Sequence, residues 1–179
     1  YDPKSDVWEK AQLFVTRCQN RSESNDQEWA GNDGGFVYGP GDSKAGGTTS
    51  YGAMSFAGLK SLIFTKAKKD DPRVQSVLKW IAKNYDFTIH PGMGTASYYY
   101  YLQTAAEAFK AYGETHIRDA KGKKRNWSAD MIEQMLSMQT KDGSWVNPNK
   151  KYWEGNPILV TARSVITLNH ALRAAGGIK

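Results

Sequence analysis

Cysteine is nearly absent from this sequence, and histidine is scarce. Cys18 is the single cysteine among 179 residues, so the chain can form neither an internal disulfide nor a zinc site with several thiolates. The three histidines, His90, His116 and His170, do not have the spacing of metal ligands. We therefore predict no metal site and no cofactor.

Long apolar runs are also missing. No stretch approaches the roughly 20 apolar residues that a membrane-spanning helix needs, so we predict no membrane span. Hydrophobic residues make up 40% of the chain and charged residues 23%, a balance typical of a folded globular domain with one core. The first residue is Tyr1 rather than Met and no leader-like segment follows it, so we expect a processed or truncated amino terminus. No signal in the sequence points to a cellular location.

The net charge of +6 is moderate, and basic residues are clustered at only two places, residues 66–69 and 121–125. Both clusters lie where we expect loops between helices. Because no nucleic-acid-binding motif accompanies them, we expect solvated surfaces and no nucleic-acid partner.

A short pattern of an acid, a glycine, a small residue and an aromatic residue occurs twice, at residues 33–36 and 142–145. Each copy lies between two stretches with apolar residues at helical spacing. When the second helical stretch of each pair is superposed on the others, Thr49, Thr95 and Thr161 fall at the same position. The chain is therefore predicted to consist of repeats.

Six helices are expected in all, at about residues 7–18, 49–66, 72–83, 95–112, 128–138 and 158–175. Asp71, Thr49 and Ser128 are the predicted N-cap residues of three of them, with Thr95 or Ser97 at the start of a fourth. Helices with a narrow apolar stripe alternate with broadly apolar ones, as in an outer ring around an inner ring. We predict an all-α fold of three α-hairpin repeats, at about residues 6–66, 71–112 and 127–176.

The spacing of Gln139, Gly143 and Trp145 resembles the QW repeat of squalene–hopene cyclases. Helix pairs with glycine-aromatic loops and threonine-capped inner helices are similar to the α/α toroid of terpenoid cyclases and protein prenyltransferase β-subunits. Residues 34–38, 50–54, 86–94 and 98–101 also resemble bacterial squalene-cyclase-like proteins with prenyltransferase and squalene-oxidase repeats. The resemblance covers nearly the whole chain and implies one partial α/α-toroid domain at residues 1–179.

The sequence lacks the residues that carry out the chemistry of that family. The Asp-x-Asp-Asp acid of squalene–hopene cyclases is absent, and Asp70 and Asp71 precede Pro72 at a helix start, where capping explains them. Cys18 has no acid two residues before it, so the prenyltransferase zinc ligands are absent too. A closed toroid has more than three helix pairs. We expect the carboxy-terminal half of a longer protein, with the missing half or a second copy completing the ring.

Aromatic residues are the candidates for a ligand-binding wall, because aromatic faces stabilise cations and pack against apolar ligands. The same residues serve equally well as ordinary core, and both alternatives stay open. The substrate-binding candidates are Tyr51, Phe56, Tyr98, Tyr99, Tyr101, Trp145 and Trp153.

Loop residues are the candidates for acid–base chemistry: Asp33, His90, Asp142 and Glu154. Protonating an alkene needs an unusually supported acid, and the sequence shows no such support. The alternative is that Asp33 and Asp142 brace turns and that His90 makes loop hydrogen bonds.

Two functions follow from these observations. The resemblance implies a terpenoid cyclase-like or prenyltransferase-like enzyme, or part of one, that acts on an isoprenoid or another apolar small molecule. The alternative is a non-catalytic toroid module whose loop end binds a glycan, a peptide or a protein partner, with Trp29, Trp145, Tyr152 and Trp153 at the surface. We expect no activity of this chain alone on linear polyprenes.

Overall fold

The computed structural model describes residues 6–177. This part of the chain is predominantly helical, which confirms the helical class, and its one sheet is a short hairpin. Within it, no helix is both long and apolar enough to cross a membrane. In chain order the elements are α1 (Val7–Arg17), α2 (Gly52–Phe64), α3 (Pro72–Lys83), α4 (Tyr98–Tyr112), β1 (His116–Arg118), β2 (Lys124–Asn126), α5 (Trp127–Ser137), the 3-10 helix η1 (Lys151–Trp153) and α6 (Pro157–Ala174).

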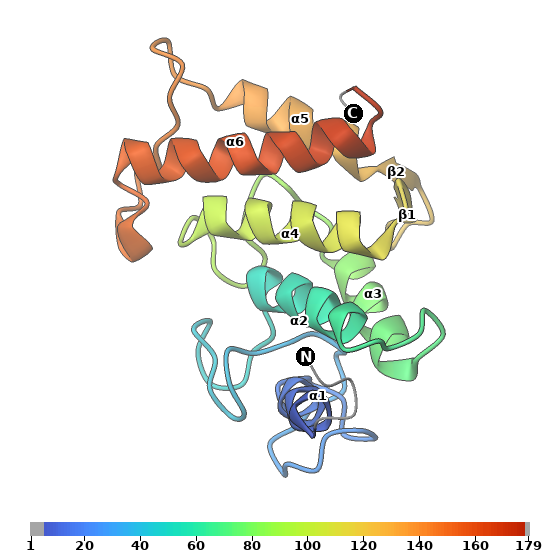
Figure 1. Cartoon of the computed structure of the whole chain (residues 1–179). Helices are drawn as coiled ribbons and strands as arrows, with labels where there is room; N and C mark the ends of the chain where they lie inside the picture. Colours follow the sequence, from blue (N-terminus) through green and yellow to red (C-terminus); the bar gives the residue numbers. More distant parts are fainter. Residues whose placement is uncertain (1–5, 178–179) are drawn as a thin grey trace.

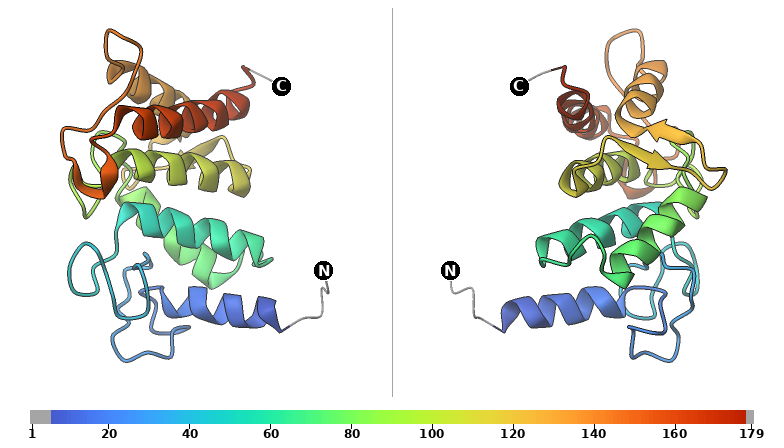
Figure 2. Two further views of the ribbon diagram at one scale, coloured as in Figure 1. Left: turned by 60° about the vertical axis from the view of Figure 1, so that its left-hand side comes forward. Right: turned by 90° about the vertical axis from the view of Figure 1, so that its right-hand side faces the viewer.

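Helices α2, α4 and α6 form one layer in which they lie side by side and run in the same direction (Figure 1). Helices α3 and α5 lie behind this layer, with α3 against α2 and α5 against α6 (Figure 2). Helix α1 lies beside α2 at one end of the stack. Because the helices of the first layer are parallel, their amino-terminal ends and the loops that precede them gather on one side of the molecule.

Helix α3 begins as the sequence predicts. The Asp71 carboxylate accepts a hydrogen bond of 2.8 Å from the backbone N–H of Arg73, and Pro72 occupies the first turn, where its missing N–H has no partner to lose. The carboxylate also pairs with the Arg73 guanidinium, which lowers the pKa of Asp71. This acid therefore caps a helix rather than protonating a substrate.

Two other predicted N-caps are wrong. Tyr51, and not Thr49, precedes α2, and its own side chain does not cap the helix. Asn126, and not Ser128, caps α5 through a hydrogen bond from the backbone N–H of Ala129. The error has a simple cause: Ser, Thr and Asn are all good caps, so several neighbouring candidates compete and the tertiary packing decides among them.

The stretch between the expected helices 95–112 and 128–138, where the sequence predicts only a loop, contains the antiparallel β1–β2 hairpin. His116 pairs with Asn126, and Arg118 with Lys124. Asp119 accepts hydrogen bonds in the turn and pairs with Arg125 at 3.0 Å. Three-residue strands of mostly polar residues are too short to show an apolar alternation, so the sequence pattern does not predict them.

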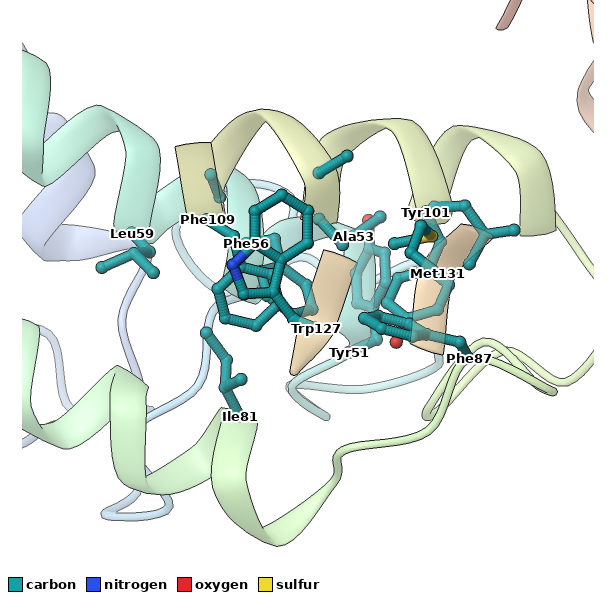
Figure 3. Packing of buried hydrophobic residues seen from close by; sticks show 14 of the residues in the cluster. Tyr51, Ala53, Phe56, Leu59, Ile81, Phe87, Tyr101, Phe109, Trp127 and Met131 are labelled. Carbon is teal, nitrogen blue, oxygen red and sulfur yellow. The ribbon is translucent and has the colours of Figure 1, made fainter. Parts of the chain in front are cut away.

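The core lies between the two layers (Figure 3). Phe56 of α2 meets Phe109 of α4 edge to face at 5.0 Å between ring centroids, and Phe109 stacks on Trp127 of α5 at 5.1 Å. Ile81 of α3 closes the cluster from below in this view. These side chains are all buried, so aromatic packing joins helices from both layers.

The absence of a side chain at Gly58 allows the loop between α1 and α2, residues 18–51, to pack onto α2. A Cβ atom at Gly58 would lie 2.4 Å from the ring of Phe36, which is itself buried. No real contact is that short, so the loop and the helix approach each other only because Gly58 has no side chain.

Helix α6 has an unusually apolar free edge. Ile158, Val165 and Ile166 are exposed. Ile158 and Val165 are about two helical turns apart, so they lie on the same side of α6, and Ile166 follows Val165 directly. These three side chains give the outer side of α6 an exposed apolar stripe.

Candidate ligand-binding pocket

Three long loops, residues 18–51, 84–97 and 138–156, precede α2, α4 and α6. A cavity of about 310 Å³ opens where these loops meet the amino-terminal ends of the three helices. Each of the three loops and each helix of the first layer contributes to its wall. Its lining residues are Tyr38, Lys44, Tyr51, Ala53, Met54, Met93, Ser97, Tyr100, Tyr152 and Arg163. A concave site lined by aromatic and methionine side chains with a few polar groups is the usual form of a small-ligand pocket.

Four of the lining residues are tyrosines, and the fold does not use their hydroxyl groups. Within residues 6–177, no hydrogen bond joins the hydroxyl of Tyr38, Tyr51, Tyr100 or Tyr152 to another group. Tyr51 is only 4% exposed, and burial raises the pKa of its phenol above the usual range. Polar groups that become buried normally need a partner, so an unpaired hydroxyl at the wall of an open cavity is available to a ligand that covers it.

Two cations complete the wall. Lys44 pairs with Asp42 at 2.8 Å and lies over the Tyr38 ring at 4.3 Å from its centroid. Arg163 of α6 lies over the Tyr100 ring at 5.0 Å. These cation–π contacts hold both tyrosine rings in place.

The backbone beside the pocket is strained. Ser97, Tyr152 and Trp153 adopt left-handed conformations, with φ values of 54°, 56° and 66°. Residues with side chains rarely occupy this region, and such strain tends to cluster at functional sites. Ser97 and Tyr152 line the pocket, while the neighbouring Trp153 is 81% exposed.

His90, a predicted catalytic residue, is fully buried behind the pocket wall and caps α2. Its Nε2 accepts a hydrogen bond of 2.9 Å from the backbone N–H of Ala53. Its Nδ1 lies 2.8 Å from the carbonyl oxygen of Ala96, so Nδ1 carries the proton. Burial lowers the pKa of His90 to about 4, and the ring stacks on Tyr101 at 4.7 Å.

Glu154, a second predicted catalytic residue, caps the amino-terminal end of α4, as His90 caps that of α2. It is 1% exposed, and its Oε1 accepts a hydrogen bond of 2.8 Å from the backbone N–H of Tyr100. Its Oε2 accepts another, at 2.7 Å, from the side chain of Asn147. Both carboxylate oxygens are therefore engaged in the structure.

The two remaining acid candidates brace turns. Asp33 accepts hydrogen bonds of 2.8 Å from the backbone N–H of Gly35 and from the Ser50 hydroxyl. Asp142 is exposed, and hydrogen bonds from Thr140 and Ser144 lower its pKa to about 2. None of the four predicted catalytic residues lines the pocket.

The predicted substrate-binding residues fall into three groups. Tyr51 lines the pocket, and Trp153 lies exposed next to it. The others are buried in the core: Phe56, Tyr98, Tyr99, Tyr101 and Trp145. The polar atoms of several of these side chains form hydrogen bonds with the backbone. The Tyr101 hydroxyl, for example, donates to the carbonyl oxygen of Asp86 at 2.6 Å.

The pocket wall also contains four residues that the sequence did not indicate as binding candidates: Tyr38, Lys44, Met93 and Arg163. These residues come from three loops or helices far apart in the chain, so no local pattern joins them. The one available signal was the repeated occurrence of long, glycine-rich loops before broadly apolar helices, since such loops often carry function.

A larger cavity, of about 530 Å³, lies between residues 85–88 and α5. Its acids include Asp130, which accepts a hydrogen bond of 2.8 Å from the Tyr85 hydroxyl, and Arg125 lies over the Tyr85 ring. The polar groups of that cavity are thus largely engaged with one another. Among residues 6–177, no group of three or more His, Cys, Asp or Glu side chains could hold a metal ion.

Comparison of the chain with protein-family models, with curated proteins and with solved structures finds no match in any of the three. The pocket geometry therefore carries the functional argument.

Proposed function

We propose that the chain is a non-catalytic module, built as part of an α/α toroid, that binds a glycan in the pocket at its loop end. The parallel layer of α2, α4 and α6 with α3 and α5 behind it supports the toroid-like arrangement. The resemblance of residues 139–145 to a QW repeat supports the same proposal.

The observation that carries this proposal is the set of unpaired tyrosine hydroxyls around one cavity. A sugar ring has an apolar face that packs on an aromatic ring and hydroxyl groups that exchange hydrogen bonds. Tyr51, Tyr100 and Tyr152 offer both kinds of contact within 310 Å³. Met54 and Met93 add adaptable apolar surface.

An isoprenoid ligand is less well supported. The aromatic residues that would line an apolar tunnel, Phe56 and Tyr101 among them, fill the core. The predicted acids His90 and Glu154 cap helices and lie outside the pocket. A carbocation reaction would require both a closed apolar cavity and an available acid.

The proposal is tested by titrating the protein with a panel of neutral and acidic oligosaccharides while following ligand NMR signals by saturation transfer. We expect at least one oligosaccharide to bind, and Tyr51→Phe to weaken that binding about 10-fold, as loss of one hydrogen bond to a buried group does. Tyr112→Phe is the matched control, because Tyr112 lies at the opposite end of α4. Absence of binding across the whole panel would refute the proposal.

A further inference from the structure

Arg163 is a cation without a carboxylate partner at the pocket wall. Its Nη1 donates a hydrogen bond of 3.1 Å to Oε1 of Gln103, and its guanidinium covers the Tyr100 ring. Its Nε is buried and has no partner. None of the ion pairs within residues 6–177 includes Arg163.

The nearest acid along this chain of contacts is already neutralised. Gln103 donates to Glu107 at 2.9 Å, and Glu107 pairs with Lys60 of α2 at 2.5 Å. Arg163 thus reaches Glu107 only through the neutral amide of Gln103, and the charge of Glu107 is balanced by Lys60. The positive charge of Arg163 is left unbalanced.

The other cation of the pocket is in the opposite situation. Lys44 pairs with Asp42 at 2.8 Å, so its charge is compensated by a carboxylate of the same chain. The unbalanced positive charge of the pocket therefore lies at Arg163, which shares the pocket wall with Tyr51 and Tyr100.

One nitrogen of Arg163 remains free for a ligand. Nη2 makes no hydrogen bond within the described residues, and unlike Nε it is not enclosed. Nη2 can therefore donate a charge-assisted hydrogen bond to a carboxylate oxygen of a ligand, and such bonds are stronger than those between neutral groups. The contact with the Tyr100 ring, at 5.0 Å, keeps the guanidinium at the pocket wall.

We infer that Arg163 binds a carboxylate, so that the ligand of the pocket is an acidic glycan with a hexuronic acid unit. This inference rests on the proposed glycan-binding function and specifies its substrate class. The tyrosines contact the sugar ring and its hydroxyl groups, and Arg163 selects the acid. A neutral sugar lacks the partner that this guanidinium requires.

The test compares each hexuronic acid oligosaccharide of the panel with the same oligosaccharide after reduction of its carboxyl groups to alcohols. We expect the intact protein to bind the best acidic oligosaccharide at least 10-fold more tightly than its reduced form, because charge-assisted hydrogen bonds are the strong ones. This comparison needs no variant, so a folding defect cannot obscure it.

Variants then assign the preference to one side chain. Arg163→Gln should abolish the preference, so that the acidic and reduced forms bind alike, and Arg163→Lys should retain part of it. Arg173→Gln is the matched control, because Arg173 is exposed on the same helix and bonds only Asn169. Equal binding of acidic and reduced forms would overturn the inference and leave glycan binding intact. Failure of every oligosaccharide to bind would instead refute the proposed function. A preference that survives Arg163→Gln would also overturn the inference.

Discussion

Glu154 caps a helix that precedes it by more than 50 residues: its Oε1 lies 2.8 Å from the backbone nitrogen of Tyr100. His90 does the same for Ala53, at 2.9 Å. In both cases a side chain of a later loop satisfies an N–H group at the start of an earlier helix. The loops that form the pocket are therefore anchored to the layer of helices by buried polar groups.

Removing the first anchor should destabilise the fold. Glu154→Ala leaves the Tyr100 N–H without its acceptor and removes one of the two acceptors of the Asn147 side-chain amide, which still donates to the Thr95 carbonyl oxygen. A buried donor left unpaired costs about 1 to 3 kcal/mol. Urea unfolding followed by circular dichroism measures the loss. Glu133→Ala is the control, because Glu133 is exposed on α5, and we expect it to change stability by less than about 0.5 kcal/mol. Equal losses in both variants would show that Glu154 is not an anchor.

The second anchor makes stability depend on pH. The pKa of His90 is lowered to about 4 by burial, whereas an unfolded histidine titrates near 6.5. Between these values the unfolded state binds the additional proton, so stability is greatest above pH 6.5 and falls as the pH drops towards 4. The loss is on the order of 3 kcal/mol.

This pH dependence is measured as the urea midpoint at pH 7.5, 6.0 and 5.0. His90→Asn removes the titrating group and should flatten the profile, even though it lowers stability at pH 7.5 by disturbing the cap. If the urea midpoint of His90→Asn still fell with pH as steeply as that of the original protein, the pH dependence would arise from other groups, such as the partly buried His170.

The helices could be predicted from the sequence, and the pocket could not. The stripe of Val74, Val77 and Ile81 identifies α3 because burial requires apolar residues at helical spacing. The same requirement explains why Phe56 and Tyr101 stayed open between core and cavity wall: the sequence pattern of an aromatic residue on a buried helix is the same in both cases. Only the packing of both layers decides between the two.

The roles of His90 and Glu154 were hidden for a different reason. A buried polar residue in a loop gives the same sequence signal whether it catalyses or caps, because both tasks need a polar group held in place. Its partners, Ala53 and Tyr100, lie 37 and 54 residues away in the chain. Contacts of that range follow from the fold and not from any local pattern.

Filling the space at Gly58 should destabilise the protein. In Gly58→Ala the new methyl group would overlap the buried Phe36 ring, and overpacking of this kind typically costs about 1 to 3 kcal/mol. Gly39→Ala is the control, because a Cβ at Gly39 meets nothing within 4 Å. Thermal unfolding compares the two. A Gly58→Ala protein at least as stable as the original would mean that α2 gains more from the better helix former than it loses in packing.

Cys18 should be unreactive in the folded protein. Its thiol is buried, and burial raises its pKa to about 11, so thiolate is scarce at pH 8. We expect slow reaction with Ellman's reagent in native buffer and fast reaction in 8 M urea, with one thiol released per chain. The native rate then reports how often the first loop opens. Fast labelling without urea would contradict the burial of this residue.

The left-handed backbone at Tyr152 and Trp153 separates two tasks within one loop. Such conformations cost about 1 to 3 kcal/mol each and persist only because neighbouring contacts impose them, here the buried Glu154 that follows. Glu154 thus anchors the loop to the helices, and within the described residues the side chains of Tyr152 and Trp153 make no hydrogen bond of their own. For directed evolution, this makes residues 152 and 153 the natural positions to randomise when a new ligand specificity is sought on an unchanged frame.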